Sequence, residues 1–549
     1  MGLLNLFSKN KVSDVVQAGR DAVAKAKALG DTAGLQDMVK LGKDAVNKAS
    51  QKATEMAQKQ SAKTPQTDIQ KLAESYVSAV SVAVYTPPKP KTGDKRLAGS
   101  QLTDLTTPEG KRLIPKGEPL DIKIGNIPIP AKDEQQHFLL AGSPGSGKSI
   151  ALRGMLQTIR DRGQKCIIYD PVGDMVQQFY RPSTDHILNP LDGRDEGWNP
   201  WQDLELHEYP AFAKSIIPDP VGSGDPFWPA AAQAVLQALM LTQPDIDSVI
   251  RVGVQAPHAV LLDAITKAGK LGLVGDPEKT LPNIRASLAA HLDKLAILRN
   301  TRMSESCSLK KWTQDDTDNS WVFLLTRADT REAVKPLITI WLDTVVRTAL
   351  SATPNPDRRI WLAIDELPSL GKIPSLAPAL AEGRKYGLSA ILCLQNVNQG
   401  RAIYGKEEFD ALYSLAKTRL ILRISDQTTA SEMSKELGEI KVNRKTQSVS
   451  EGTNSGSSTG QSSSTSYGSN SGESINEAIV TEMIVLPSQI IALPDKVGYM
   501  RMGGTDHVIK IDIPYIPCVP MLVNGKEQID HMPVTQRQMP WSVKLDIDR

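Results

Sequence analysis

The sequence predicts an α/β fold with a mostly parallel, doubly wound sheet. Near-continuous apolar runs are typical of strands that helices cover on both faces. Such runs occur at HFLLAG (137–142), KCIIYDP (165–171), SWVFLLT (320–326), RIWLAIDEL (359–367), LSAILCLQN (388–396) and RLILRIS (419–425). Helical patterns separate several of these runs, and parallel strands need crossover connections of this kind. The stretch KVGYMRMGGTDHVIKIDIP (496–514) predicts a hairpin that closes the sheet.

A helical segment interrupts this alternation. Residues 196–310 show mostly helical patterns, with PAAAQAVLQALML and IRASLAAHLDKLAIL as the clearest examples. We therefore expect an all-α domain inserted between two strands of the sheet. The main domain is then assembled from residues 99–195 and 311–515.

The remaining segments differ in composition from this core. Residues 1–85 are expected to form an N-terminal helical arm, because 12–62 are rich in Ala, Lys and Gln with helical periodicity. A repeat within the arm, VVQAGRDAVAKA and MVKLGKDAVNKA, favours docking or oligomerisation over DNA binding. Proline- and lysine-rich residues 86–98 predict a linker, and residues 516–549 a C-terminal tail. Residues 446–474, rich in Ser, Gly and Thr, predict a disordered loop, because they cannot bury enough apolar surface to offset their ordering entropy.

Composition sets limits on the partners and the compartment. The 549 residues include 64 Lys and Arg and 62 Asp and Glu, so a nucleic-acid contact would need a local basic patch. The four cysteines show no metal-ligand spacing, which fits a reducing compartment. No stretch of about 18 uncharged apolar residues occurs, so no transmembrane helix is predicted. The first residues, MGLLNLFSKNK, are expected to be a solvated end rather than an amphipathic membrane contact.

The strongest motif is Gly142-Ser143-Pro144-Gly145-Ser146-Gly147-Lys148-Ser149, which matches the P-loop pattern G-x-x-x-x-G-K-[ST]. It follows an apolar run and opens a helical pattern, as phosphate binding requires. The glycines let backbone N–H groups wrap the phosphates, and the helix N-terminus adds a favourable dipole. We expect Lys148 to reach the β- and γ-phosphates of ATP, and the Ser149 hydroxyl to ligate Mg²⁺.

An acid pair is expected to complete this site. Asp365 and Glu366 follow four apolar or aromatic residues in WLAIDE, at a predicted strand end. In a P-loop site the first acid holds Mg²⁺ through water, and the second can polarise the attacking water. Such a pair is weak evidence by itself, but downstream of a P-loop in the same sheet it predicts ATP hydrolysis.

Two further residues are candidates for the same chemistry. Gln395 ends the run LSAILCLQN, where a glutamine can sense the γ-phosphate or orient water, or else simply cap a turn. Arg384, in ALAEGRKYG, suits an arginine finger that completes a neighbouring subunit's site, or else is a surface arginine.

Two other segments have open interpretations. Asp170, in DPVGD, could assist Mg²⁺ or water, or could form a rigid turn. Phe227 and Trp228, in DPFWP, could stack on DNA bases, although packing between the helical domain and the sheet is the favoured interpretation.

The combination of motifs resembles a known family. QLTD, IKIGNIPIP, AGSPGSGKS, IIYDPVGD, HILNPLDGR, DPFWP, AIDELPSLGKIPSL, EGRKYG and CLQN occur in the order found in TraD-type coupling proteins of bacterial conjugation and type IV secretion. The resemblance runs from about residue 96 to 515. P-loops occur in many ATPases, whereas the combination of DPVGD, NPLD, DPFW and DELPSLGKIPSL is typical of a much narrower group of proteins.

This resemblance implies a RecA-like, hexameric ATPase that binds single- or double-stranded DNA and links the relaxase–DNA complex to the secretion channel. It implies ATP binding by Gly145, Gly147, Lys148 and Ser149, with hydrolysis completed by Asp365 and Glu366. Gln395 aligns with the family's third motif, and Arg384 with its proposed interface arginine.

The sequence departs from the family at its start, because family members usually begin with two transmembrane helices. The arm at 1–85 could dock onto a membrane-protein partner, so we expect a cytoplasmic protein held peripherally at the inner-membrane face. A soluble version of the motor is the other interpretation. Two alternative functions also stay open: another RecA-like DNA-pumping ATPase, and a nucleotide-binding adaptor that recruits secretion substrates without pumping.

Overall fold

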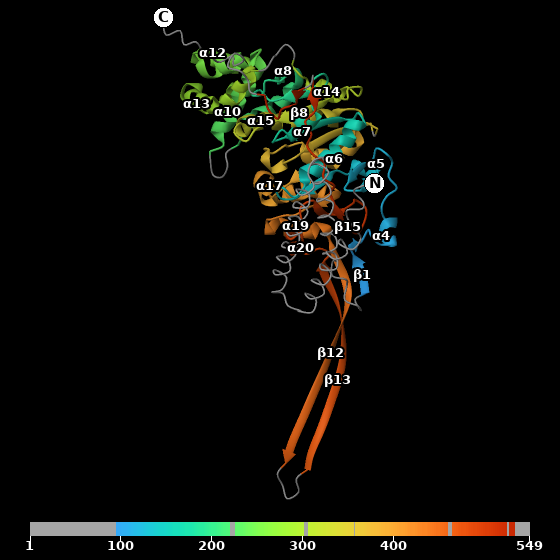
Figure 1. Ribbon diagram of the computed structural model, residues 1–549. Coiled ribbons are helices and arrows are strands. Elements are labelled where there is room, and N and C mark those ends of the chain that lie inside the picture. Colours follow the sequence, from blue (N-terminus) through green and yellow to red (C-terminus); the bar gives the residue numbers. More distant parts are fainter. Residues whose placement is uncertain are drawn as a thin grey trace, which may run out of the picture. The chain divides into compact units, whose positions relative to one another are not determined.

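The computed structural model describes residues 95–219, 225–300, 306–355, 357–458, 464–523 and 526–532 (Figure 1). The predicted arm at 1–85 lies outside the described residues, as do most of the predicted linker and the end of the predicted tail. The chain divides into two compact units, Met1–Lys95 with Asn443–Ala478 and Arg96–Val442 with Ile479–Arg549.

The larger unit is built on a sheet of ten strands. In spatial order they are β2 (Gln101–Thr103), β15 (His507–Asp512), β14 (Val497–Arg501), β11 (Thr418–Ile421), β5 (Phe138–Ala141), β10 (Leu388–Leu394), β9 (Ile360–Ile364), β6 (Lys165–Asp170), β8 (Trp321–Leu325) and β7 (His186–Leu188). The pairs from β11 to β7 are all parallel, whereas β14 pairs antiparallel with both β11 and β15. The six predicted apolar strands and the predicted hairpin all lie in this sheet. The prediction of a mostly parallel α/β fold is therefore confirmed.

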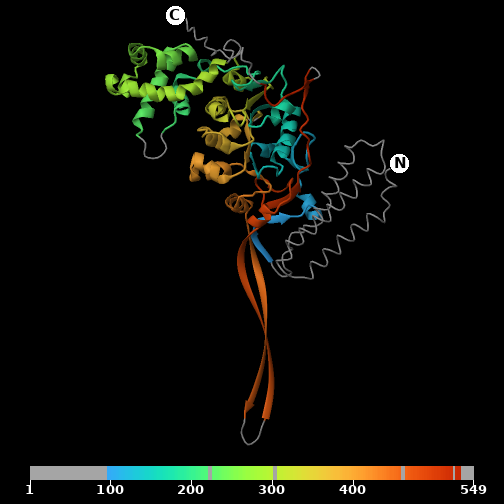
Figure 2. The ribbon, with the colours of Figure 1, turned by 60° about the vertical axis from the view of Figure 1, so that its left-hand side comes forward.

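Helices cover both faces of the sheet because its strands are apolar on both faces (Figure 2). In β10, Leu392 points into one buried cluster, whereas Ile391 and Cys393 point into the other. The cluster on the Ile391 face includes α6 (Lys148–Asp161) and α7 (Asp174–Phe179). The cluster on the Leu392 face includes α15 (Arg331–Ser351), α16 (Leu376–Glu382), α17 (Val397–Tyr404), α18 (Lys406–Ser414), α19 (Gln427–Leu437) and α20 (Pro487–Ile491).

Between β7 and β8 the described residues form helices and no strand. They are α8 (Pro200–Asp203), η1 (Leu206–Glu208), α9 (Tyr209–Ile216), α10 (Phe227–Thr242), α11 (Ile246–Ile250), η2 (Arg251–Gln255), α12 (His258–Lys267), η3 (Leu271–Leu273), α13 (Pro277–Ala296), η4 (Ile297–Asn300) and α14 (Leu309–Gln314). Their apolar side chains join the cluster on the Leu392 face. The segment predicted as an inserted all-α domain, 196–310, falls within this region.

Shorter elements complete the larger unit. They are α4 (Pro108–Arg112), β3 (Ile122–Ile124), β4 (Ile127–Ile129), α5 (Ala131–Glu134), η6 (Leu367–Ser369), η7 (Gly383–Tyr386), β16 (Leu522–Val523) and β17 (Lys526–Glu527). Among the described helices, none is both long enough and apolar enough to cross a membrane.

The predicted disordered loop at 446–474 differs from the structure. β12 (Glu439–Ser458) and β13 (Ser464–Met483) are long strands that form a three-stranded sheet with β1 (Lys95–Gly99). The composition argument considered only the burial of apolar side chains, whereas a β-ladder is made by main-chain N–H and C=O groups that Ser, Thr and Gly also have. The prediction of a linker over 86–98 is likewise wrong for residues 95–98, which belong to β1.

Candidate nucleotide-binding site

The glycine-rich loop joins the carboxyl end of β5 to the first turn of α6. Gly145 has φ 75° and Gly147 has φ 112°, and L-residues with a side chain rarely adopt such values. A Cβ atom at Gly147 would also lie 3.3 Å from Lys496 Cα. The two glycines therefore allow a backbone path that another residue would strain.

Neighbouring segments hold the loop in this shape. Gly142 N–H donates to the Leu394 carbonyl at the end of β10 (3.0 Å), and Ser143 N–H donates to the Arg423 carbonyl just after β11 (2.8 Å). On the other side, Lys496 N–H donates to the Ser146 carbonyl (2.8 Å). Because the loop is fixed by three other parts of the fold, its backbone is preorganised for a ligand.

Polar groups of the loop point inward without a full set of partners. Lys148 is only 6% exposed, and its Nζ folds back onto the Gly142 carbonyl at 2.5 Å. Among the described residues, the buried Ser146 Oγ has no hydrogen-bond partner. Ser149 is half-buried in the first turn of α6. These groups fit a phosphate chain, which would accept hydrogen bonds from them.

The acid pair lies at the same edge of the sheet as this loop. Asp365 and Glu366 directly follow β9, which runs parallel to β10, and β10 runs parallel to β5. Burial raises the pKa of Asp365 to about 6, helped by the nearby Asp170 carboxylate and opposed by the Lys148 ammonium. Burial likewise raises the pKa of Glu366 to about 7, again opposed by Lys148. The structure therefore brings Lys148 and both acids together, as predicted from their positions in the sequence.

Gln395 joins this group. The register pairs Leu394 with Ala141, so Gln395 and Gly142 follow at adjacent strand ends. Gln395 lies close enough to Glu366 to lower its pKa and partly offset the effect of burial, although both Glu366 carboxylate oxygens are buried without a hydrogen-bond partner in the described part of the chain. Gln395 is thus placed beside the acid, at the strand end next to the loop.

The donor set also fits a magnesium ion held together with phosphates. Among the described residues, no group of three or more His, Cys, Asp or Glu could hold a metal by itself. Mg²⁺ is commonly bound by one or two protein groups together with substrate phosphates and water, so this is no obstacle. Ser149 and Asp365, whose Oδ1 is buried without a hydrogen-bond partner in the described part of the chain, are the residues that would hold it.

Asp170 takes the structural role of the two considered. Its fully buried carboxylate accepts backbone N–H groups from Gly173 (2.7 Å), Met175 (2.9 Å) and Val176 (2.9 Å). The carboxylate thereby fixes the turn into α7. Its oxygens are occupied by this turn, so Asp170 affects the site through its charge beside Asp365.

The structure does not bring Arg384 to the P-loop of its own chain, and it places the aromatic pair Phe227 and Trp228 in the helical region. Arg384 lies in η7, just before the amino end of β10, whereas the P-loop lies at the carboxyl ends of the parallel strands. Phe227 and Trp228 open α10, with ring centroids 5.0 Å apart, and Trp228 packs against the main core. Phe227 is exposed, so packing of both aromatic residues between the helical domain and the sheet stays a prediction.

One residue and one chain segment that lie near the site were not predicted from the sequence. Lys496 contacts the P-loop from the start of β14 and has φ 63°, a strained value for a residue with a side chain. The segment after residue 515, which showed no pattern, also lies along this edge: Arg153 in α6 donates to the Ile516 carbonyl (3.2 Å), and Asp192 accepts the Met532 N–H (3.0 Å). No sequence motif marks either contact.

The sheet is mostly parallel, a P-loop joins β5 to α6, and an acid pair lies at the same edge of the sheet. These features define the class of P-loop ATPase folds. Comparison with known proteins gives the family. Residues 121–514 match the family described as "Type IV secretion-system coupling protein DNA-binding domain". The chain therefore belongs to the type IV secretion-system coupling proteins, and the resemblance noted in the sequence is confirmed.

Individual relatives agree with this assignment. The coupling protein TraD of Escherichia coli K12 is 29% identical over 446 residues, which cover 78% of this chain and 59% of TraD. The chain thus spans about three fifths of the length of that relative. Solved structures of the plasmid coupling protein TrwB are also similar. The complex with ADP and Mg²⁺ has a TM-score of 0.66 and 26% identity, covering 82% of this chain and the whole of the TrwB chain in that structure. The match to the complex with the ATP analogue ADPNP covers 80% of this chain and 98% of the TrwB chain in that structure, with the same score and identity.

Proposed function

We propose that this chain is an ATPase that moves DNA, and that it links a relaxase–DNA complex to a type IV secretion channel in bacterial conjugation. The observation that supports it best is the meeting of Lys148, Glu366 and Gln395 at the P-loop, inside a domain that matches the coupling-protein family. TrwB, a similar protein, has been solved with ADP and Mg²⁺ and with ADPNP, which supports ATP and Mg²⁺ as the ligands here.

Each residue at the site has a proposed task. Backbone N–H groups of 142–149 and the Lys148 ammonium bind the phosphates, while Ser149 and Asp365 hold Mg²⁺. Bound Mg²⁺ would neutralise the charge that develops on the phosphates. Glu366, with a pKa of about 7, accepts a proton from the attacking water, and Gln395 orients Glu366 and that water.

Arg384 is proposed to act on a neighbouring copy of the chain. Its place at the opposite end of β10 separates it from the P-loop of its own chain. A guanidinium supplied by an adjacent subunit can stabilise the charge of the transition state. This requires contact between copies of the chain, and we propose a homo-hexameric ring in which each ATP lies between two subunits.

The setting of the protein follows from the same family assignment. We propose a cytoplasmic protein held peripherally at the inner membrane, with residues 1–85 docking onto a membrane-protein partner. The predicted division into a nucleotide-binding domain (99–195 and 311–515) and an inserted helical domain (196–310) is retained as part of this proposal.

Two other functions compete with this one. A nucleotide-binding adaptor would recruit secretion substrates while another ATPase supplied the work, and a different RecA-like pump would act on DNA outside secretion. The shifted pKa of Glu366 favours an active enzyme over an adaptor, because buried acids with a pKa near 7 are typical of catalytic sites.

The deciding experiment measures the ATPase rate with and without single- and double-stranded DNA, over a range of protein concentrations. Stimulation by DNA that rises with protein concentration, and that is lost in Lys148→Ala, supports an assembling motor. A rate that neither DNA nor Lys148→Ala changes would leave the adaptor as the better account.

A further inference from the structure

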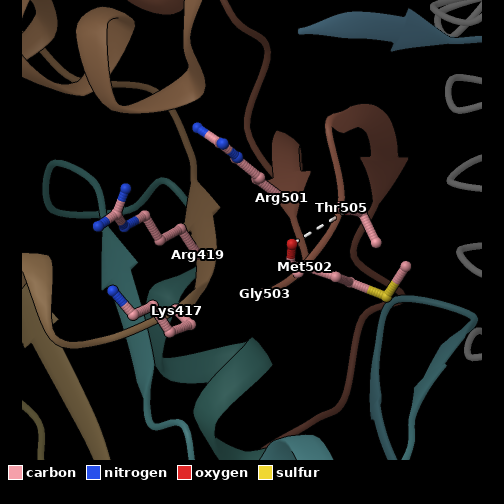
Figure 3. A pocket seen from close by; sticks show the side chains of 7 residues that line it. Lys417, Arg419, Arg501, Met502, Gly503 and Thr505 are labelled. Carbon is pink, nitrogen blue, oxygen red and sulfur yellow. Dashed lines mark hydrogen bonds between the residues drawn. The ribbon is translucent and has the colours of Figure 1, made fainter.

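A basic pocket lies away from the P-loop, at the amino end of β11 and the carboxyl end of β14. Lys417, Arg419 and Arg501 line it together with residues 502–505 of the turn between β14 and β15. Figure 3 shows the three cationic side chains extending to the same side, away from Met502 and Thr505. The cavity measures about 150 Å³, well above the roughly 10–15 Å³ that a single water needs on this measure, so a phosphodiester group fits.

The fold places these charges where they repel one another. Arg419 and Arg501 are directly opposed in the antiparallel register of β11 and β14, and like charges in that position are unfavourable. The end of α19 relieves part of this cost. Glu436 forms an ion pair with Arg419, and its carbonyl accepts a hydrogen bond from Arg501 Nη1 at 2.8 Å.

This compensation leaves a positive pocket. One carboxylate, Glu436, stands against three cations, and Asp506, which follows the pocket turn, is already paired with Arg96 at 2.6 Å. Within the described residues, the exposed Lys417 Nζ donates a hydrogen bond to one group, the Ser414 carbonyl, at 3.3 Å. In the described part of the chain, Arg501 makes its hydrogen bonds through Nη1, so its other nitrogens can still donate.

Two glycines shape the wall of the pocket. A Cβ atom at Gly503 would lie 2.8 Å from Lys417 Cβ, so the close approach of the lysine to the turn requires glycine there. Gly504 has φ 76° and faces open space, because no atom of the described residues lies within 4 Å of the point that its Cβ would occupy. The turn is therefore bare backbone beside three cations, an arrangement suited to an anion.

We propose that this pocket binds a backbone phosphate of DNA during translocation, through Lys417 and Arg501, with Arg419 supporting them. The inference rests on the proposed function, because it assigns part of the DNA contact. All three cations lie within residues 121–514, the segment that matches a DNA-binding domain, and this favours DNA over an anionic lipid. The pocket lies at the opposite end of β11 from the P-loop, so nucleotide and DNA phosphate do not compete.

The test measures DNA binding by the full chain at several salt concentrations. Fluorescence anisotropy of a labelled oligothymidylate gives the slope of log K against log[salt], to which each phosphate contact on a single strand contributes about 0.7. We expect the double variant Lys417→Gln/Arg501→Gln to lower the slope by about 1.4 and to weaken binding about 25-fold at 0.1 M salt. ATP binding and the ATPase rate without DNA should stay at the wild-type level.

Matched variants separate the pocket from general charge. Lys123→Gln removes an exposed lysine on β3 and should leave the slope unchanged, and Lys417→Arg keeps the charge and should also bind as wild type. Equal salt slopes for wild type and the double variant would overturn the proposed role of the pocket but not the proposed function. The same holds if the double variant loses binding to phosphatidylglycerol vesicles while its DNA binding is unchanged. A wild-type chain that binds no DNA at any salt concentration would overturn the proposed function as well.

Discussion

Replacing Glu366 by glutamine should abolish most ATP hydrolysis while leaving nucleotide binding intact. The substitution keeps the size of the side chain and its place next to Gln395, but it removes the carboxylate that would accept the proton of the attacking water. Lys148 and the P-loop backbone, which are proposed to bind the phosphates, are untouched. The variant therefore separates binding from chemistry.

The size of the effect follows from the proposed role. A positioned general base contributes about 10²–10⁴-fold, or roughly 2.7–5.4 kcal/mol of activation free energy. The pKa of about 7 belongs to the site without nucleotide or Mg²⁺, so it adds a second signature in kcat/KM: the wild-type kcat/KM should fall about tenfold per pH unit below 7, as Glu366 becomes protonated. An ordinary glutamate would lose activity only near its usual pKa of about 4.3.

The assay is steady-state ATPase activity between pH 5.5 and 8.5, with binding of a fluorescent ATP analogue measured in parallel. We expect Glu366→Gln to bind the analogue within about twofold of wild type and to lose the pH dependence along with the rate. A variant that retained more than about a third of the wild-type rate would refute the assignment of Glu366 as the base. Lys148→Ala, which should lose binding itself, is the control.

Three further predictions concern backbone shape, a buried ion pair and proton linkage. Gly147→Ala should weaken nucleotide binding at least fivefold, because an alanine is strained at φ 112° and its Cβ atom would press on Lys496. The control is Gly269→Ala, where φ is 68° and the added Cβ atom would meet open space; this variant should leave the nucleotide affinity unchanged in the same titration. Arg160→Met should cost about 3–5 kcal/mol in a urea unfolding curve, because it leaves the fully buried Asp185 without its 2.6 Å partner; a loss under 1 kcal/mol would contradict this. Glu366→Gln should also stabilise the fold. The folded-state pKa of Glu366 lies above the unfolded one, so the free energy of unfolding of the wild type falls as pH rises from about 4.5 to 7. The stability gained by Glu366→Gln should therefore grow from near zero at pH 4 to at most about 3 kcal/mol at pH 8. A stability gain that does not change with pH would refute this prediction.

The sequence was sufficient for the fold class and for bringing the P-loop, Asp365, Glu366 and Gln395 to one edge of the sheet, but it did not reveal Lys496 or the segment after residue 515. Strands buried on both faces must be apolar throughout, so β5, β6 and β8–β11 were recognisable one by one. The P-loop depends on local backbone geometry, which Gly145 and Gly147 reveal directly. Since parallel strands present their carboxyl ends at one edge, the positions of Asp365 and Gln395 after strands implied that they would meet.

Two features of the chain could not be predicted correctly from composition or local sequence. The Ser- and Gly-rich stretch from 446 to 474 shows few apolar residues, yet it forms most of β12 and β13, because strand pairing uses main-chain hydrogen bonds. Asp170 could not be assigned between metal and turn, since only the folded chain shows its carboxylate taken up by backbone N–H groups.

The sequence by itself determined what depends on local chemistry and periodicity: the apolar strands, the phosphate-binding loop and the acids that follow β9. Only the tertiary structure decided what depends on residues far apart in the chain. Burial in the folded chain raises the pKa of Glu366 to about 7. The pairing of β11 with β14 places Arg419 directly opposite Arg501. Burial and cross-strand contacts arise from packing between segments, and no local pattern of residues encodes them.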